Sequence, residues 1–522
     1  MILAALRTPD IVVLFVYFAL LIGAGFYFRK RSGTVEGFTV ANRSLPGWVV
    51  GLSVFGTYLS SNTFIGVPGK AYGSNWNGFV FSLSLPIAAF IAVKWFVPFY
   101  RQHAGLSAYE HLEKRFGAWA RVYAVVCYLL TQVSRVGTIM FGVSVGLHAL
   151  TGWDIATIIV FSGAAVTLYT LMGGIEAVIW TDAIQSVVLT VGAAVVVILI
   201  LTDMPEGPGQ AIQLAEEAGK FSLGDFGPSL ASSTFWVMLM YGVIMNLTNF
   251  GIDQNYVQRY HVAESDKAAG RSVWFGSLVY IPVALMFFFI GSILFSYGEA
   301  NPEFLAEVKL EMVAADSPGL AKNSAEAMRL AGELQPSDYG DKVLPHFIAN
   351  KIPAGLAGLL IAALFAAAMS SIDTSLNSSA TIALQDFYRR WVRPDADEAQ
   401  SLRFLRVMTV VWGIIGTGVA LAMMGVESIL DAWWKLSGVF AGGMLGLFLL
   451  GFISRRATNA GAVTGATVGL LVILWLTFST GLTGDLEWLR SPFHAHMTSV
   501  IGTLSIFLIG LGASQVFGRK SD

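Results

Sequence analysis

The stretch Ser53-Val-Phe-Gly56-Thr57-Tyr58-Leu59-Ser60-Ser61-Asn62-Thr63 interrupts a longer apolar segment, and Gly66, Pro68 and Gly69 follow it closely. In lipid, an unwound backbone is tolerated only where protein or a water-filled cavity satisfies its polar groups. Transporters use such breaks to present carbonyls and hydroxyls to an ion and a substrate near the middle of the bilayer. The stretch therefore predicts a broken membrane helix at a transport site.

The composition of the whole chain fits a membrane protein. Of its 522 residues, 55% are hydrophobic and 13% are charged, whereas about 25% of residues are charged in soluble globular proteins. Many apolar runs reach the roughly 20 residues that a membrane-spanning helix needs. The single cysteine, Cys127, excludes an intramolecular disulfide. The sequence has neither a G-x-x-x-x-G-K-[ST] nor an H-E-x-x-H pattern, so it predicts no P-loop nucleotide site and no zinc-protease site.

The apolar runs predict an all-α polytopic membrane protein with about 13 spans. We place these spans near 10–28, 47–69, 76–100, 120–150, 153–172, 181–201, 232–256, 273–298, 353–383, 404–424, 430–453, 459–478 and 496–516. The segment 299–344 is the one long polar insertion, and its Ala/Glu/Leu-rich composition predicts one or two short helices.

The loops between these spans alternate in charge. Basic residues gather in the loops 29–43, 101–121, 259–271, 389–406 and 455–456 and after residue 516, whereas the long loops 202–231 and 299–344 are rich in Asp and Glu. Because basic loops stay in the cytoplasm, we expect the N-terminus outside and the C-terminus inside. This pattern predicts a multi-pass protein of the plasma membrane, the inner membrane of a bacterium.

The twelfth span carries Gly461, Gly465 and Gly469 at intervals of four residues. This spacing is typical of close helix packing in membranes. It fits packing within the chain better than a dimer interface, and we expect the protein to work as a monomer.

A second interruption supports the transport hypothesis. The seventh span contains Asn246, Thr248, Asn249, Gly251 and Asp253. It lies five spans after the first broken span, which is the relation that an inverted repeat of five helices produces. Paired interruptions in two halves of a chain indicate a transporter binding site, although a kink filled by neighbouring helices would look similar.

The ninth span carries hydroxyl groups on one helical face. Ala367, Ser370, Ser371 and Thr374 share that face by the i, i+3, i+4 rule. Hard cations take oxygen ligands, so these hydroxyls, opposite the free carbonyls of a broken helix, would suit a sodium ion.

Three ionisable residues lie within or at the edge of spans: Arg135, Asp182 and Asp373. Such residues are costly in the membrane and usually face a partner or a cavity. Arg135 could pair with Asp182 or Asp373, or bind an anionic substrate. Asp182 could be stabilised at a helix start or ligate a cation. Asp373 could ligate a cation, carry a proton or neutralise Arg135.

The chain resembles the sodium:solute symporter family over nearly its whole length. The motifs that carry the resemblance are Leu45-Pro-Gly47-Trp48, Ser60-Ser61-Asn62-Thr63-Phe64, Gly173-Gly174 through Trp180-Thr181-Asp182-Ala-Ile-Gln185, Gln254-Asn-Tyr256-Val-Gln258-Arg259, and Ser370-Ser371 through Asn377-Ser378. The resemblance implies one transmembrane domain with a LeuT-like 5+5 inverted-repeat core at 46–453. An extra helix and loop would precede it at 1–45, and two helices would follow at 454–522.

The resemblance also implies sodium ligands. A first sodium ion would contact the carbonyls of Gly56, Leu59 and Ala367 and the hydroxyls of Ser370 and Ser371. A second ion, found in some members, would use Asp182, Ser370, Asp373 and Thr374. The position of Asp373 usually carries a hydroxyl residue in this family, so the expected number of sodium ions is one or two.

For the substrate, the chain resembles bacterial sialic acid symporters. Ser60, Thr63 and Arg135 match residues that hold the sialate carboxylate and neighbouring groups. Tyr58 replaces a small hydroxyl residue and Ser82 replaces a glutamine, and Asn246 matches a sugar-contacting asparagine of sodium/galactose symporters. The expected substrate site comprises Thr57, Tyr58, Ser60, Asn62, Thr63, Ser82, Arg135 and Asn246.

We therefore expect a sodium-coupled symporter, not an enzyme, that imports an organic solute. A sialic acid or similar anionic sugar is the leading substrate, and a neutral sugar or small carboxylate is the alternative. A membrane enzyme would need a constellation of His, Asp or metal ligands at one interface, which the sequence does not show.

Overall fold

The structure is a computed structural model that describes residues 7–60, 62–103, 105–317, 320–321, 324–424 and 443–517. Helices account for most of these residues. The described residues form no β-strand. One isolated parallel bridge joins Leu45 to Ala263. The expected all-α architecture is confirmed.

The first half of the chain contains the helix and loop expected before the core and the helices of the first predicted repeat. They are α1 (Thr8–Phe28), α2 (Val35–Val40), α3 (Gly47–Tyr58), the π-turn η2 (Asn62–Gly66), α4 (Val67–Gly73), the span formed by η3, α5, α6, η4 and α7 (Trp76–Phe79, Val80–Leu83, Leu85–Ile91, Ala92–Phe96 and Val97–Gln102), α8 (Glu110–Phe116), α9 (Ala118–Thr151), α10 (Ile155–Thr202) and α11 (Pro208–Glu217).

The second half continues with helices of similar length. They are α12 (Phe235–Ile252), α13 (Gln254–Val262), α14 (Asp266–Ala300), α15 (Pro302–Asp316), α16 (Ala325–Glu333), α17 (Pro336–Lys351), α18 (Leu356–Ile382) with the π-helical η5 (Ala383–Val392), α19 (Glu398–Ala422), α21 (Met444–Ile453), α22 (Asn459–Phe478) and α23 (Met497–Phe517). The predicted span 430–453 begins in residues outside the described chain, which resumes just before α21.

Helix α10 is two membrane spans joined at a turn. Its 48 residues would extend about 72 Å as one straight helix, more than twice the roughly 30 Å of a bilayer core. Gly174 interrupts it with φ +54°, and a Cβ there would lie 2.9 Å from the carbonyl oxygen of Phe38. Only glycine takes this conformation without strain.

Contacts to α1 show that the two halves of α10 run antiparallel. Tyr17 accepts a hydrogen bond from Gln185 at 3.0 Å, and the ring of the neighbouring Phe18 packs on Phe161 at 5.2 Å between centroids. Gln185 and Phe161 lie on opposite sides of Gly174. The two halves of α10 therefore lie beside the same part of α1. This agrees with the two separate predicted spans, 153–172 and 181–201.

Ten helices among the described residues are long and apolar enough to cross a membrane, and α10 is counted as one of them. The broken helix α3–α4 and the short α21 fall outside that set. The total of 13 spans stays a prediction.

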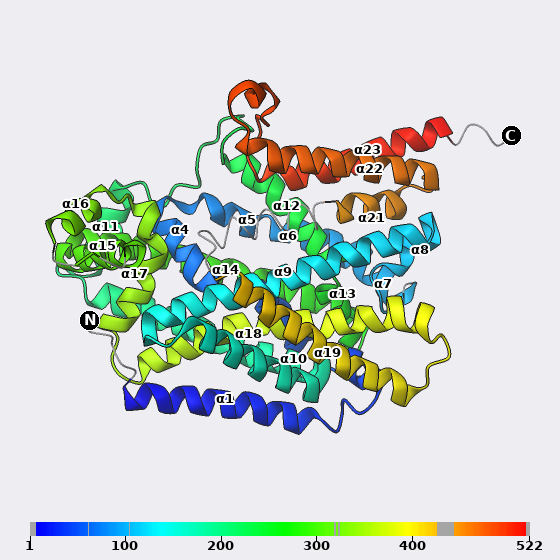
Figure 1. Ribbon diagram of the computed structural model, residues 1–522, viewed down its shortest axis with the longest axis horizontal. Coiled ribbons are helices and arrows are strands. Elements are labelled where there is room, and N and C mark those ends of the chain that lie inside the picture. The colour runs from blue at the N-terminus through cyan, green and yellow to red at the C-terminus, as the bar shows by residue number, and fades with distance from the viewer. Residues whose placement is uncertain are drawn as a thin grey trace.

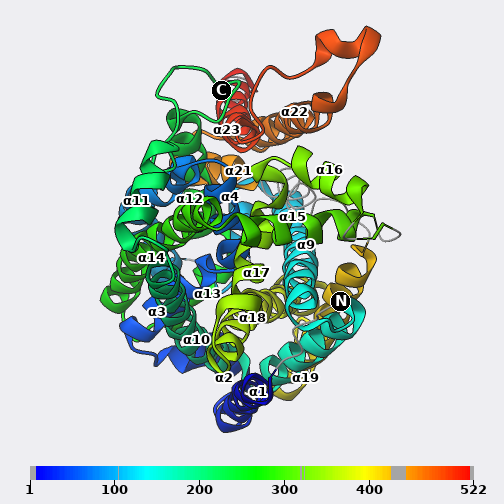
Figure 2. The ribbon, with the colours of Figure 1, turned by 90° about the vertical axis from the view of Figure 1, so that its left-hand side faces the viewer.

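The long helices run mostly along one axis of the molecule (Figure 1). Helices α11, α15, α16 and α17 gather at one end, where α1 begins, and α7 and α8 lie at the other, where α23 ends. Figure 2 looks along the bundle from the end that carries α15–α17. The insertion 299–344 holds two complete short helices, α15 and α16, as expected, and a third helix, α17, begins within it and continues past its end.

The glycine stripe of α22 packs against α23 of the same chain. A Cβ on Gly461 would lie 2.0 Å from the Ser514 hydroxyl, and one on Gly469 would lie 2.1 Å from the Ile506 side chain. The prediction of packing within the chain is confirmed.

Candidate sodium and substrate sites

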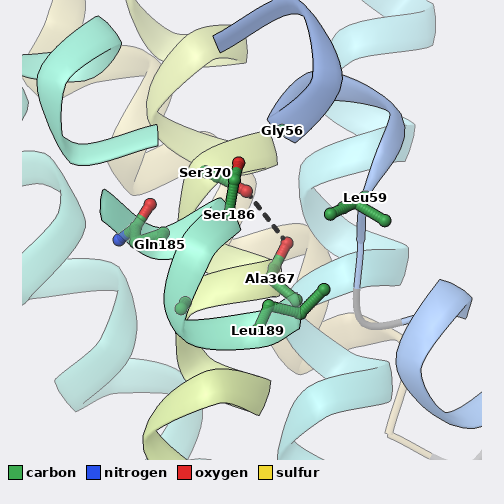
Figure 3. Close-up of a pocket in the computed structure, with 8 residues that line it drawn as sticks. Gly56, Leu59, Gln185, Ser186, Leu189, Ala367 and Ser370 are labelled. Atoms are coloured by element: carbon green, nitrogen blue, oxygen red, sulfur yellow. Dashed lines mark hydrogen bonds between the residues drawn. The ribbon is translucent and has the colours of Figure 1, made fainter. Parts of the chain in front are cut away.

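The interruption of α3 creates a small pocket against α18 and α10. Helix α3 ends at Tyr58, and Leu59 is extended, with φ −84° and ψ 126°. Gly56 and Leu59 line this pocket, together with Ala367 and Ser370 of α18 (Figure 3). The fifth expected ligand, Ser371, donates its hydroxyl hydrogen to the Leu59 carbonyl oxygen at 3.4 Å. All five residues expected around the first sodium ion therefore lie together.

The pocket also has a wall that the sequence analysis did not predict. Gln185, Ser186 and Leu189 of α10 line it. The Gln185 amide donates to Tyr17, while its buried carbonyl oxygen has no hydrogen-bond partner among the described residues. A Cβ on Gly56 would lie 2.6 Å from the Ser186 hydroxyl, so glycine permits this close approach. The unpartnered oxygen suits a hard cation.

A second polar cluster centres on Asp182 and Arg259, which form a 2.7 Å ion pair with no exposed surface on either side chain. Ser53 donates to the same Asp182 oxygen, Oδ2, at 2.6 Å. Arg259 also donates to Thr374 Oγ1 at 2.8 Å. The other Asp182 oxygen, Oδ1, has no hydrogen-bond partner among the described residues. Asp182 lies two turns beyond Gly174, so the helix-start interpretation is wrong.

Asp373 joins this cluster from α18. Its Oδ2 accepts the Tyr169 hydroxyl hydrogen at 2.6 Å, and its Oδ1 accepts from the Thr374 backbone N–H at 2.5 Å. Two carboxyl groups and one guanidinium are thus buried together, and with both carboxyl groups ionised their formal charges sum to −1. Arg259 was assigned from the sequence to a basic loop, and its complete burial in α13 corrects that assignment.

Arg135 pairs with neither Asp182 nor Asp373, so both predicted pairings are wrong. Its Nη1 lies 4.0 Å from Asp253 Oδ2, and its Nη2 donates to the Thr57 carbonyl oxygen at 3.2 Å. Asp253 occupies the break between α12 and α13 and accepts a hydrogen bond from the Asn255 N–H at 2.8 Å. Arg135 therefore lies between the two broken helices.

Aromatic rings cover the same region. The Tyr58 ring packs at 5.1–5.9 Å, between centroids, against Phe250, Tyr256 and Tyr280. The Tyr280 hydroxyl lies beside Thr63 and Ser82. The Thr63 hydroxyl in turn accepts from the Ser60 backbone N–H at 3.3 Å.

Tyr58, Ser60, Thr63, Ser82 and Arg135 thus lie in one region. The other three expected substrate residues are Thr57, Asn246 and Asn62. The Thr57 hydroxyl bonds to the Ser53 carbonyl oxygen within α3, which leaves its backbone carbonyl to face Arg135. Asn246 is fully buried and donates to Ser84 at 3.0 Å, so it lies between two helices. The Asn62 side chain lies outside the described part of the structure.

The sequence profile of the sodium:solute symporter family matches residues 38–469. The sodium/sialic acid symporter NanT of Aliivibrio fischeri is 32% identical over 514 residues, which cover 98% of this chain and 94% of that protein. The sodium/sialic acid symporter SiaT of Proteus mirabilis is 32% identical over 510 residues, with coverage of 97% and 94%.

Solved structures agree with this relationship. A Na+-coupled sialic acid symporter in a substrate-bound, outward-open state superposes with a TM-score of 0.85 at 30% identity, covering 98% of both chains. The nucleobase-cation-symport-1 family transporter Mhp1 superposes with a TM-score of 0.54 at 16% identity, covering 92% of this chain and 94% of the other, which shows a likeness of fold alone. The predicted fold class is confirmed, and the chain belongs to the sodium:solute symporter family.

Proposed function

We propose that this protein imports a sialic acid or a similar anionic sugar together with sodium. The position of Arg135 is the main structural support for an anionic substrate. A guanidinium has five N–H donors, and here one donates to a backbone carbonyl while the nearest carboxylate, on Asp253, is 4.0 Å away. The remaining donors can bind a carboxylate in the two-pronged arrangement that arginine favours. The two sialic acid symporters described above support this substrate class.

The first sodium ion would bind in the small pocket between α3, α10 and α18. Its ligands would be the carbonyls of Gly56, Leu59 and Ala367 and the hydroxyls of Ser370 and Ser371. The Gln185 carbonyl oxygen is a further candidate, because it lines this pocket and lacks a partner. This ligand set has no formal charge, so the ion's own charge would remain to be balanced by its surroundings.

A second sodium ion would bind beside Asp182, with Ser370, Asp373 and Thr374 as further ligands. The unpartnered Asp182 Oδ1 offers a free acceptor. The net formal charge of −1 in the cluster would favour one added cation. Arg259 already neutralises one of the two carboxylates, which supports one ion here rather than two.

The helix after the second break, α13, is packed on all sides. Every residue of α13 is buried, whereas Lys70 on α4 is exposed. In the expected orientation, with the N-terminus outside and the C-terminus in the cytoplasm, α13 seals the cytoplasmic side. Each sodium ion that moves inward through 100 mV releases about 2.3 kcal/mol before the concentration gradient is added.

A small carboxylate is the second candidate substrate. Tyr58, packed among Phe250, Tyr256 and Tyr280, occupies space next to Arg135 and would leave less room for a nine-carbon sugar. A neutral sugar has weaker support, because the Asn246 amide is bonded to Ser84.

Uptake by the purified protein in liposomes tests the proposal. A sodium gradient, but not a potassium gradient, should drive accumulation of labelled sialic acid. Arg135→Ala should abolish this uptake, and Ser134→Ala, a matched control on the same helix whose hydroxyl bonds back to the Leu130 carbonyl oxygen, should retain most of it. Sodium-driven uptake of a small carboxylate, but not of sialic acid, would favour the second candidate. Uptake that ignores the sodium gradient would contradict the proposal.

A further inference from the structure

A groove of about 460 Å³ lies between the beginnings of α3 and α14, away from both polar clusters. It is lined by Pro46, Gly47, Trp48, Glu264, Ser265, Lys267, Ala268, Arg271 and Phe275. The two helices cross closely here, since a Cβ on Gly47 would lie 3.0 Å from the Ala268 carbonyl oxygen. Backbone therefore forms the floor of the groove, and longer side chains form its walls. Figure 2 shows α3 and α14 together at the edge of the bundle.

Two basic side chains dominate the polar end of the groove. Lys267 and Arg271 are one turn apart on α14, so they project from the same face, and both are exposed. Neither forms an ion pair with a residue that the structure describes. The carboxylate of Asp266 is already paired with Arg101 at 2.5 Å. Glu264 is the one acidic side chain in the wall, so positive charge exceeds negative charge.

The same face of α14 becomes apolar beyond Arg271. Phe275, Leu278 and Leu285 follow with exposed fractions of 41%, 51% and 36%. The 35 residues of α14 extend about 52 Å, longer than the roughly 30 Å hydrocarbon layer, so its first turns lie at the level of the lipid headgroups. Trp48, which is 56% exposed, is of the residue type enriched at that level.

We propose that this groove binds an anionic phospholipid of the membrane leaflet on the side of the basic loops. The lipid phosphate would lie between Lys267 and Arg271, with the first backbone N–H groups of α14 nearby. Its acyl chains would follow Phe275 and Leu278, and Trp48 would flank the headgroup. Basic pockets between membrane helices on the cytoplasmic side are known lipid-headgroup sites. A lipid headgroup would interact with the basic end of the groove and its acyl chains would cover the apolar end, whereas a free phosphate would leave the apolar end uncovered.

Native mass spectrometry of the delipidated, detergent-purified protein measures this binding directly. The first bound phosphatidylglycerol should bind more tightly than phosphatidylcholine. Because each basic side chain near an anionic surface contributes about fivefold in affinity, Lys267→Gln/Arg271→Gln should weaken phosphatidylglycerol binding about 30-fold. The charge-preserving Lys267→Arg/Arg271→Lys should retain it.

A matched control is Arg455→Gln/Arg456→Gln, which removes two exposed basic side chains from another basic loop and should leave the binding unchanged. A melting temperature measured without lipid shows whether each variant is folded. Equal phosphatidylglycerol binding in wild type and Lys267→Gln/Arg271→Gln would overturn the proposal. Full competition by soluble glycerol phosphate would overturn it in favour of a phosphate site, and a dimer lost in that variant would assign the groove to a second copy of the chain.

Discussion

The two polar clusters in the membrane region differ in how they balance charge. The pocket around Gly56, Leu59 and Ser370 is lined by apolar side chains and neutral polar groups, with no charged residue among its lining residues. The cluster around Asp182 and Asp373 holds its own cation, the guanidinium of Arg259. The proposed sodium pocket therefore holds no fixed charge, whereas the second cluster already contains an internal ion pair next to a second carboxyl group, that of Asp373.

This difference has a physical consequence for each cluster. Removing one partner of a fully buried ion pair leaves an uncompensated charge, which is costly to the folded state. Removing a neutral hydroxyl ligand weakens ion binding but leaves no buried charge behind. We therefore expect mutations in the Asp182 cluster to affect stability first, and mutations in the neutral pocket to affect sodium dependence first.

The largest expected effect comes from Arg259→Gln. It leaves Asp182 and Asp373 buried without their cation, and the expected loss of stability is about 3–5 kcal/mol. The melting temperature of the detergent-purified protein in potassium buffer measures it. The double variant Arg259→Gln/Asp182→Asn should recover most of the loss, because it removes the orphaned charge as well. An unchanged melting temperature in Arg259→Gln would show that the pair does not stabilise the fold.

The next effect concerns the neutral pocket. Ser370→Ala/Ser371→Ala removes two hydroxyl ligands, and hydrogen-bonding groups that contact a charge contribute roughly 1.5–3 kcal/mol each. The sodium concentration for half-maximal uptake should therefore rise about a hundredfold or more, with little change in melting temperature in potassium.

Ser375→Ala is the matched control for this experiment. The Ser375 hydroxyl bonds back to the Ser371 carbonyl oxygen within α18, so its removal should leave the sodium dependence nearly unchanged. If Ser375→Ala and Ser370→Ala/Ser371→Ala raise the sodium requirement equally, the pocket is not the sodium site.

Asp373→Asn removes the ionisable carboxyl group of the second cluster that has no cationic partner of its own. The amide keeps the side-chain size and still accepts the Tyr169 hydroxyl hydrogen, but the summed formal charge becomes zero. The dependence of uptake on sodium concentration should lose its steepness, with a Hill coefficient that falls from about two towards one. An unchanged coefficient would place Asp373 outside the ion-binding step.

The smallest expected effect is that of Gly56→Ala. Its Cβ would approach the Ser186 hydroxyl to 2.6 Å, and overpacking of this kind costs about 1–3 kcal/mol. The Ser186 hydroxyl can rotate, so we expect the low end of that range, seen as a modest increase in the sodium requirement. Adding Ser186→Ala should reverse the increase, and a failure to reverse it would mean that Ser186 does not lie against the pocket.

The neutral pocket could be predicted because its residues follow local rules. A run of hydroxyls and glycines marks the break of α3, and the i, i+3, i+4 spacing places Ala367, Ser370 and Ser371 on one face of α18. Gln185 was missed because its position in the pocket depends on the antiparallel turn at Gly174, which brings α10 against both helices.

The partners of the charged residues were harder to predict, because they depend on tertiary packing. Arg259 follows a span in the sequence and looks like one more basic loop residue, yet α13 continues inward and buries it beside Asp182. Asp253 was visible in the interrupted seventh span, but nothing local indicates that it faces Arg135 from another helix. The polar run from Gln254 to Arg259 directly after the break was the available signal.

The charge that crosses the membrane with each substrate molecule tests the central claim most directly. If both clusters bind a sodium ion and the substrate carries one negative charge, one net positive charge enters per substrate. Uptake into liposomes should then accelerate when a potassium diffusion potential makes the interior negative, and simultaneous current and tracer measurements should give about one charge per substrate. Uptake that ignores the potential and carries no net charge would contradict the account, because only one of the two clusters would then bind sodium.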